Sequence, residues 1–102
     1  MQQYNKLVRD KIPKIIEDSG KSATIRILSD SEYVNALETK LDEEVGEYHR
    51  DKSVEELADI LEVIYALAAT CGCSRAQLEQ VYFEKHCKRG GFTQKICLTS
   101  VE

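Results

Sequence analysis

Apolar residues recur at helical spacing through the middle of the chain. Between residues 30 and 51 they follow one another at steps of three and four, as Val34, Leu37, Leu41, Val45 and Tyr48. This spacing places them on one face of an α-helix. Ser29 and Glu32 precede the stripe with the S-x-x-E pattern of a capping box. The pattern predicts an amphipathic helix that ends at a turn formed by Asp51 and Lys52.

The next segment is apolar on nearly all sides. It begins with a second S-x-x-E pattern at Ser53 and continues as ELADILEVIYALAAT, where Glu62 is the only charged residue between Asp59 and Thr70. A helix of this kind belongs at the centre of a bundle or at a subunit interface. We therefore expect a homodimer or homotetramer that covers this helix.

Two further helices flank this pair. Ser74 to Gln77 forms a third capping box and starts a helix with Leu78, Val81 and Tyr82 facing inward, which should stop near Gly90-Gly91. The pattern from Asn5 to Ser19 also predicts a helix, which Gly20 ends. Pro13 offers another start for this helix, with residues 6–12 as an extended or separately turned arm.

The order of these elements predicts an all-α fold. The connections are short, so successive helices should be antiparallel neighbours in a small helical bundle, and residues 1–102 should form a single domain. Two segments have strand character: TIRIL at 24–28 is short and β-branched, and FTQKICL at 92–98 could pair with it. Their pairing would add a minor two-stranded β appendage.

Composition narrows the functional classes. The chain has 102 residues, 42% of them hydrophobic and 31% charged, a balance that argues against disorder. Its formal net charge of −4 disfavours a nucleic acid polymer as the partner but permits a small anionic substrate. No apolar run suits a signal peptide or approaches the roughly 18 residues of a membrane span, so we expect a soluble, cytoplasmic protein without a membrane partner.

The four cysteines give little indication of a site. Cys71 and Cys73 form a C-x-C pair, Cys87 and Cys97 stand alone, and no histidine lies at zinc-finger distance from the pair. A zinc site needs four converging ligands. The pattern favours buried or incidental reduced thiols, with a metal or redox site as the alternative.

Four carboxylates are the strongest chemical signal. Glu44 and Glu47 are three residues apart, and Glu56 and Asp59 repeat that spacing after the turn. Residues three apart share a helix face, so an antiparallel hairpin would bring the two pairs together. Such a cluster would repel itself unless a hard cation such as Mg²⁺ neutralised it. The alternative is a solvated charged face, in which Glu56 serves only as a capping residue.

The acidic motifs resemble those of a known family. Lys40 to Glu47 reads K-L-x-E-E-x-x-E and Glu55 to Leu61 reads E-E-L-A-D-I-L. Together they resemble the MazG-like all-α nucleoside triphosphate pyrophosphohydrolases, a superfamily that includes phosphoribosyl-ATP pyrophosphohydrolase and dimeric dUTPases. YNKLVRDKIPKII at 4–16 and KHCKRGGF at 85–92 resemble the phosphoribosyl-ATP pyrophosphohydrolase-like, or house-cleaning, subgroup. Only eight residues, 48–55, separate the acidic motifs, fewer than in many relatives, which leaves the substrate open.

The resemblance implies a reaction and a set of residues. It implies Mg²⁺-dependent cleavage, with Mn²⁺ as a substitute, between the α and β phosphates of a nucleotide to give a monophosphate and pyrophosphate. The metal ligands would be Glu44, Glu47, Glu56 and Asp59. Glu43 would position or deprotonate the water, although a solvent-facing role is equally open. The basic residues that would bind the substrate are Lys6, Arg9, Lys40, Lys85, Lys88 and Arg89.

The basic motif and the function each have alternative interpretations. The basic residues before Gly90-Gly91 also suit an ordinary helix C-terminus, where cations offset the helix dipole. A catalytically inactive helical binding or regulatory module would have the same fold. A nucleic-acid-binding helical domain has only the KHCKRGG patch in its favour.

Overall fold

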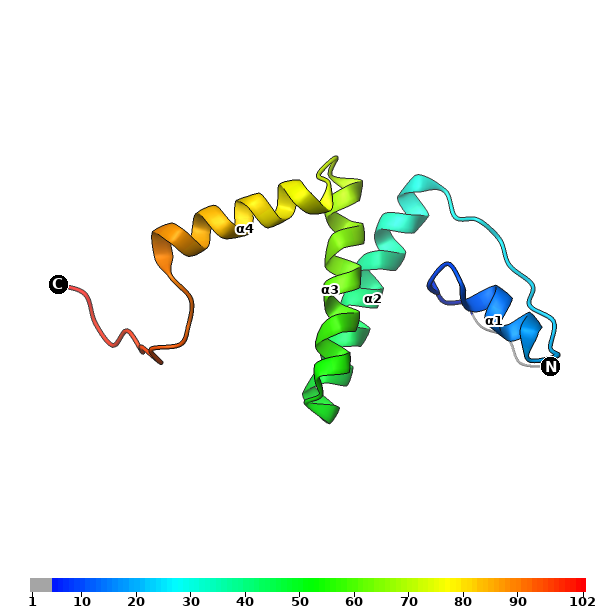
Figure 1. Ribbon diagram of the computed structural model, residues 1–102, viewed down its shortest axis with the longest axis horizontal. Helices are drawn as coiled ribbons and strands as arrows, with labels where there is room; N and C mark the ends of the chain where they lie inside the picture. Colours follow the sequence, from blue (N-terminus) through cyan, green and yellow to red (C-terminus); the bar gives the residue numbers. More distant parts are fainter. Residues whose placement is uncertain (1–4) are drawn as a thin grey trace.

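The computed structural model describes residues 5–102, and this part of the chain is all-helical (Figure 1). It contains four helices in the order α1 (Ile12–Asp18), α2 (Asp30–Asp51), α3 (Val54–Thr70) and α4 (Arg75–Arg89). The predicted fold class is confirmed. The arrangement of the helices differs from the predicted bundle in several respects.

Helix α1 is shorter than a helix over residues 5–19, and it agrees with the alternative in which the helix starts near Pro13 and a separate arm precedes it. It begins at Ile12 with Pro13 in its first turn, where proline's missing N–H costs no helical hydrogen bond. It ends as predicted, because Gly20 follows the helix with φ of 91°, a conformation that glycine adopts without steric cost. Residues 5–11 are not helical and are called the N-terminal arm below.

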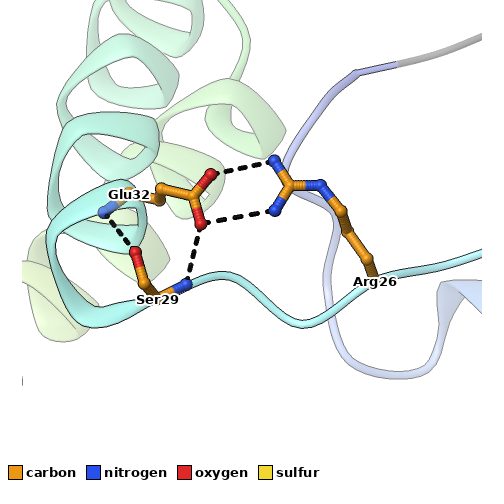
Figure 2. Close-up of polar contacts among 3 residues, drawn as sticks. All are labelled: Arg26, Ser29 and Glu32. Atoms are coloured by element: carbon orange, nitrogen blue, oxygen red, sulfur yellow. Dashed lines mark hydrogen bonds and ion pairs between the residues drawn. The ribbon is translucent and has the colours of Figure 1, made fainter.

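The start of α2 is fixed by the predicted capping box. The Ser29 hydroxyl accepts a hydrogen bond from the Glu32 amide at 3.3 Å, and the Ser29 amide donates to the Glu32 carboxylate at 3.0 Å. Arg26 adds an ion pair to the same carboxylate at 3.0 Å (Figure 2). The Arg26 guanidinium and the Ser29 donors together lower the pKa of Glu32 to about 2. These bonds anchor the loop before α2 to its first turn.

Helices α2 and α3 form the antiparallel hairpin that the sequence predicts. Lys52 closes α2 in the left-handed conformation, with φ of 54°, and Ser53 caps α3 through the Glu56 amide at 3.4 Å. The reciprocal half of this second capping box is not formed, because the Glu56 carboxylate lies beside other acidic side chains instead of the Ser53 amide. Leu37 and Val63 are buried between the two helices.

Helix α4 departs from the predicted bundle. It turns away from α3 by 106° instead of folding back as an antiparallel neighbour, and α3 is the only described helix that it packs against (Figure 1). Tyr65 on α3 donates a hydrogen bond to Glu79 on α4 at 3.0 Å, and Arg75 donates to the same carboxylate at 2.9 Å while its guanidinium lies over the Tyr65 ring. These contacts stabilise the open angle. The predicted inward positions Val81 and Tyr82 are consequently exposed.

The predicted β appendage is wrong for the part of the chain that the structure describes. Residues 24–28 and 92–98 are irregular, and Figure 1 places them on opposite sides of the molecule along its longest axis. A strand without a partner leaves its backbone groups without a ladder of hydrogen bonds. The β-branched composition of these segments therefore does not produce a sheet.

The molecule is extended and leaves much apolar surface uncovered. Its radius of gyration is 18.0 Å, whereas a compact domain of 100 residues has a value near 13 Å. An apolar groove of about 780 Å³ runs along the inside of the α3–α4 angle. Its exposed apolar lining includes Leu61, Ile64, Tyr82 and Phe83.

Among the described residues, no single helix has both the length and the apolar character to cross a membrane. The bent pair α3 and α4 meets those criteria only when the two helices are taken together.

We predict that the chain self-associates through α3 and the groove beside it. Sedimentation equilibrium at micromolar concentration should show a dimer or tetramer, because covering this apolar surface is favourable. Leu61→Glu, at a position that is 45% exposed, should shift the protein towards monomer while retaining the hairpin. Glu62→Gln on the same helix is the matched control. A wild-type protein that sediments only as a monomer would contradict the prediction.

Candidate metal centre

Three carboxylates converge at the closed end of the α2–α3 hairpin. Glu44 comes from α2, and Glu56 and Asp59 come from the first two turns of α3. One oxygen from each lies within 4.8 Å of the other two. The antiparallel packing brings these residues together, because positions near the end of α2 face positions near the start of α3.

Two of these carboxylates each have one buried oxygen without a hydrogen-bond partner among residues 5–102. Glu44 is 7% exposed and is the one buried charged residue of the described chain. Its Oε2 atom and the Oε2 atom of Glu56 are both buried and receive no hydrogen bond from the described residues. A buried carboxylate oxygen without a donor is unfavourable. A solvated acidic face would not have this burial, so the geometry argues against that reading.

Burial and mutual repulsion affect the titration of the cluster. Burial raises the pKa of Glu44, and the charges of Glu47 and Asp59 raise it further, while Lys40 opposes them. Burial likewise raises the pKa of Glu56, and the neighbouring Glu47 carboxylate raises it further. Glu47 therefore lies beside both residues, although the set that converges within 4.8 Å contains Glu44, Glu56 and Asp59.

Two cations lie at the rim of the cluster. Arg9, on the N-terminal arm, donates from Nη2 to Oδ1 of Asp59 at 2.7 Å. The Lys40 ammonium lies 3.7 Å from Glu44 and 3.9 Å from Glu43. The structure thus brings two of the predicted substrate-binding residues to the acidic cluster. It also places Glu43 beside Lys40, as a side chain that is 39% exposed.

A pocket of about 220 Å³ lies between the N-terminal arm and α2, and Lys40, which also pairs with Glu44, connects it to the cluster. Lys6 enters it from the arm, and Lys40 and Glu43 line it from α2. Asn5, Asn35 and Thr39 supply further polar groups. Three predicted residues, Lys6, Lys40 and Glu43, therefore line the same pocket.

The remaining predicted residues lie elsewhere in the chain. Lys85, Lys88 and Arg89 are exposed near the end of α4, which extends away from the hairpin (Figure 1). The helix stops at Gly90, whose φ is 78°. Because α4 packs only against α3 and leaves it at the end opposite Glu56, these cations are separate from the cluster within one chain.

One contact of the cluster carried no sequence signal. Arg9 and Asp59 are 50 positions apart, so neither helical spacing nor a motif links them. The described residues contain no disulfide: Cys71, Cys73, Cys87 and Cys97 are all free, and all but Cys73 are exposed rather than buried.

The donor set fits a hard divalent cation. Carboxylate oxygens are the ligands that Mg²⁺ and Mn²⁺ prefer, and an acidic cluster with two unpartnered buried oxygens has the charge that such a cation would neutralise. Glu44, Glu56 and Asp59 could hold the ion directly, with Glu47 beside them.

Comparisons with known proteins identify one partial relative. The chain is 61% identical over 41 residues to a protein of Mycolicibacterium smegmatis that is described only as uncharacterized. The match covers 40% of this chain and 42% of that protein, so the chain spans less than half of the relative's length. No family model and no solved structure matches the chain.

We predict that Glu44→Gln stabilises the metal-free fold. The substitution removes a charge that burial and neighbouring carboxylates disfavour, so the melting temperature should rise by roughly 2–5 °C. Glu43→Gln is the matched control, because it also removes a partner of Lys40 but lies outside the cluster. Circular dichroism melts without divalent cations would measure both variants. If Glu44→Gln lowered the melting temperature as much as Glu43→Gln does, the proposed repulsion at Glu44 would be contradicted.

Proposed function

We propose that this protein is a Mg²⁺-dependent nucleotide pyrophosphohydrolase that cleaves between the α and β phosphates of a nucleotide. The observation that carries the proposal is the buried Glu44 carboxylate, which has an unpartnered oxygen and converges with Glu56 and Asp59. The resemblance of the acidic and flanking motifs to MazG-like enzymes supports the same reaction. Mn²⁺ would substitute for Mg²⁺, because both prefer oxygen ligands.

The carboxylates would hold the metal at the edge of the pocket. Glu44, Glu56 and Asp59 are the expected ligands, and Glu47 is a fourth candidate beside them. When bound there, Mg²⁺ would offset the negative charge of the phosphates and activate a water molecule for attack.

The adjoining pocket would take the phosphate chain. Lys6 and Lys40 line it and would neutralise phosphate oxygens, while Glu43 lines the same pocket and could accept a proton from the attacking water. At about 220 Å³ the pocket is smaller than the cavities that usually enclose a complete small-molecule ligand. A ribose and base would therefore extend beyond it, and the short hairpin turn supplies little to recognise them.

The basic residues at the end of α4 would contribute to substrate binding only at the carboxylate cluster of a second chain. The KHCKRGGF motif predicts phosphate binding by Lys85, Lys88 and Arg89. Within one chain, however, these residues lie apart from the cluster. In a homodimer or homotetramer, α4 of another copy could approach the hairpin. Self-association would then serve both to cover the groove and to complete the binding surface.

We predict that Glu47→Gln and Asp59→Asn each reduce hydrolysis by at least about a hundredfold without loss of helical structure. Each change keeps the side chain's size and removes the charge that a hard cation requires. The assay is pyrophosphate release from a panel of nucleotides with Mg²⁺. Glu62→Gln, the same change at an exposed position of α3, is the control. Wild-type turnover in Glu47→Gln and Asp59→Asn would refute the proposed roles, and nucleotide binding without turnover by the wild type would favour the inactive module.

We also predict that Mg²⁺ stabilises the wild-type fold. Free Mg²⁺ at about a hundred times its Kd would add about 2.7 kcal/mol to the free energy of unfolding, because the ion binds the native state alone. Thermal melts over a MgCl₂ titration should show the shift, and KCl at equal ionic strength is the control. A melting temperature that stays constant across the titration would count against the metal site.

A further inference from the structure

The ion pair between Arg9 and Asp59 connects two distant parts of the chain at the acidic cluster. Arg9 belongs to the N-terminal arm, and its Nη2 atom lies 2.7 Å from Oδ1 of Asp59 on α3. The two side chains are 56% and 41% exposed. Asp59 is one of the three residues whose carboxylate oxygens converge within 4.8 Å. The guanidinium therefore stands at the rim of the candidate metal centre.

A divalent cation in the cluster would compete with this guanidinium. The Arg9 guanidinium carries a positive charge, as the cation does. Two positive charges that share Asp59 repel each other strongly at such short range. An exposed ion pair is weak, and releasing it costs little. The metal should therefore displace Arg9 from Asp59.

Displacement would leave Arg9 free beside the pocket that we assign to phosphate. Asn5, Lys6 and Leu7 of the same arm line that pocket, opposite Lys40 and Glu43. A guanidinium presents its N–H groups as a planar fork that binds two phosphate oxygens at once. Arg9 is not among the residues that line the pocket, so a movement of the arm or of its own side chain would have to bring it to an anion bound there.

We infer that Arg9 occupies the place of the metal in the metal-free protein, where it binds Asp59. When a divalent cation enters the cluster, Arg9 is released and binds the substrate's phosphate. This inference rests on the proposed function and adds an order of binding to it. The cation binds first, and the affinity for the anion then rises. The arm thereby makes phosphate binding depend on metal loading.

The test compares the affinity of three proteins for Mg²⁺ by isothermal titration calorimetry. Arg9→Ala should bind Mg²⁺ about three- to fivefold more tightly than wild type, the factor that an exposed ion pair contributes. Arg26→Ala is the matched control, because it removes the comparable exposed pair with Glu32, which lies outside the cluster (Figure 2). Its Mg²⁺ affinity should equal that of wild type. Circular dichroism verifies that each variant is folded.

A second titration follows magnesium pyrophosphate binding at a fixed, saturating concentration of free Mg²⁺. Arg9→Ala should bind this anion about tenfold more weakly than wild type, because a charge-assisted contact is lost. Arg9→Lys keeps the charge without the fork, so both of its affinities should lie between those of wild type and Arg9→Ala.

The outcomes separate the two proposals. If wild type binds Mg²⁺ and Arg9→Ala binds it equally or more weakly, Arg9 does not compete with the metal and the inference is wrong, while the metal site stands. Unchanged pyrophosphate binding in Arg9→Ala would also overturn it. If the folded wild-type protein binds no Mg²⁺, the proposed function fails and the inference fails with it.

Discussion

Repulsion among three carboxylates at the closed end of the α2–α3 hairpin is the constraint on which the rest of this account depends. Glu44, Glu56 and Asp59 lie within reach of one ion, and burial removes the water that would otherwise screen Glu44. Arg9 and Lys40 offset part of the charge from the rim, but the inner oxygens of Glu44 and Glu56 have no donor among the described residues. We expect such an arrangement to lower the stability of the metal-free fold and to favour the binding of a cation.

The hairpin that creates this cluster also orients the surfaces around it. Its first helix carries Lys40 and Glu43 to a pocket shared with the N-terminal arm, and its second helix leads into the elbow with α4. The bonds of Glu79 to Tyr65 and Arg75 favour an open angle at that elbow. An open elbow exposes apolar side chains that a chain of this length would otherwise bury. Helix α3 thus contributes both to the carboxylate cluster and to the exposed apolar groove.

The sequence predicted the helices well because their boundaries depend on local chemistry. Ser29 and Ser74 act as caps through residues three positions away, and the apolar stripe of α2 faces α3 as its spacing indicates. The proximity of Glu44 to Glu56 followed from the same spacing together with a short turn. In each case the relevant partners lie within a few turns of one another along the chain.

The errors concern contacts between distant residues. Short connections predicted that α4 would fold back, but the bend depends on side chains of α3 and α4 that no periodicity reveals. TIRIL has strand composition, yet it has no partner nearby, because the tail lies on the other side of the molecule. The separation of Lys85, Lys88 and Arg89 from the cluster follows from the direction of α4. The Arg9–Asp59 pair spans 50 positions and had no signal in either motif.

We propose that Glu44, Glu56 and Asp59 bind one divalent cation directly. A crystal structure of the protein with Mn²⁺ would test this most directly, because an anomalous-difference map locates the ion without assumptions about activity. We expect a peak between the three carboxylates, with oxygens of all three at roughly 2.0–2.6 Å from the ion. A map with no peak at the cluster at saturating Mn²⁺, or with Mn²⁺ bound only at other carboxylates, would contradict it.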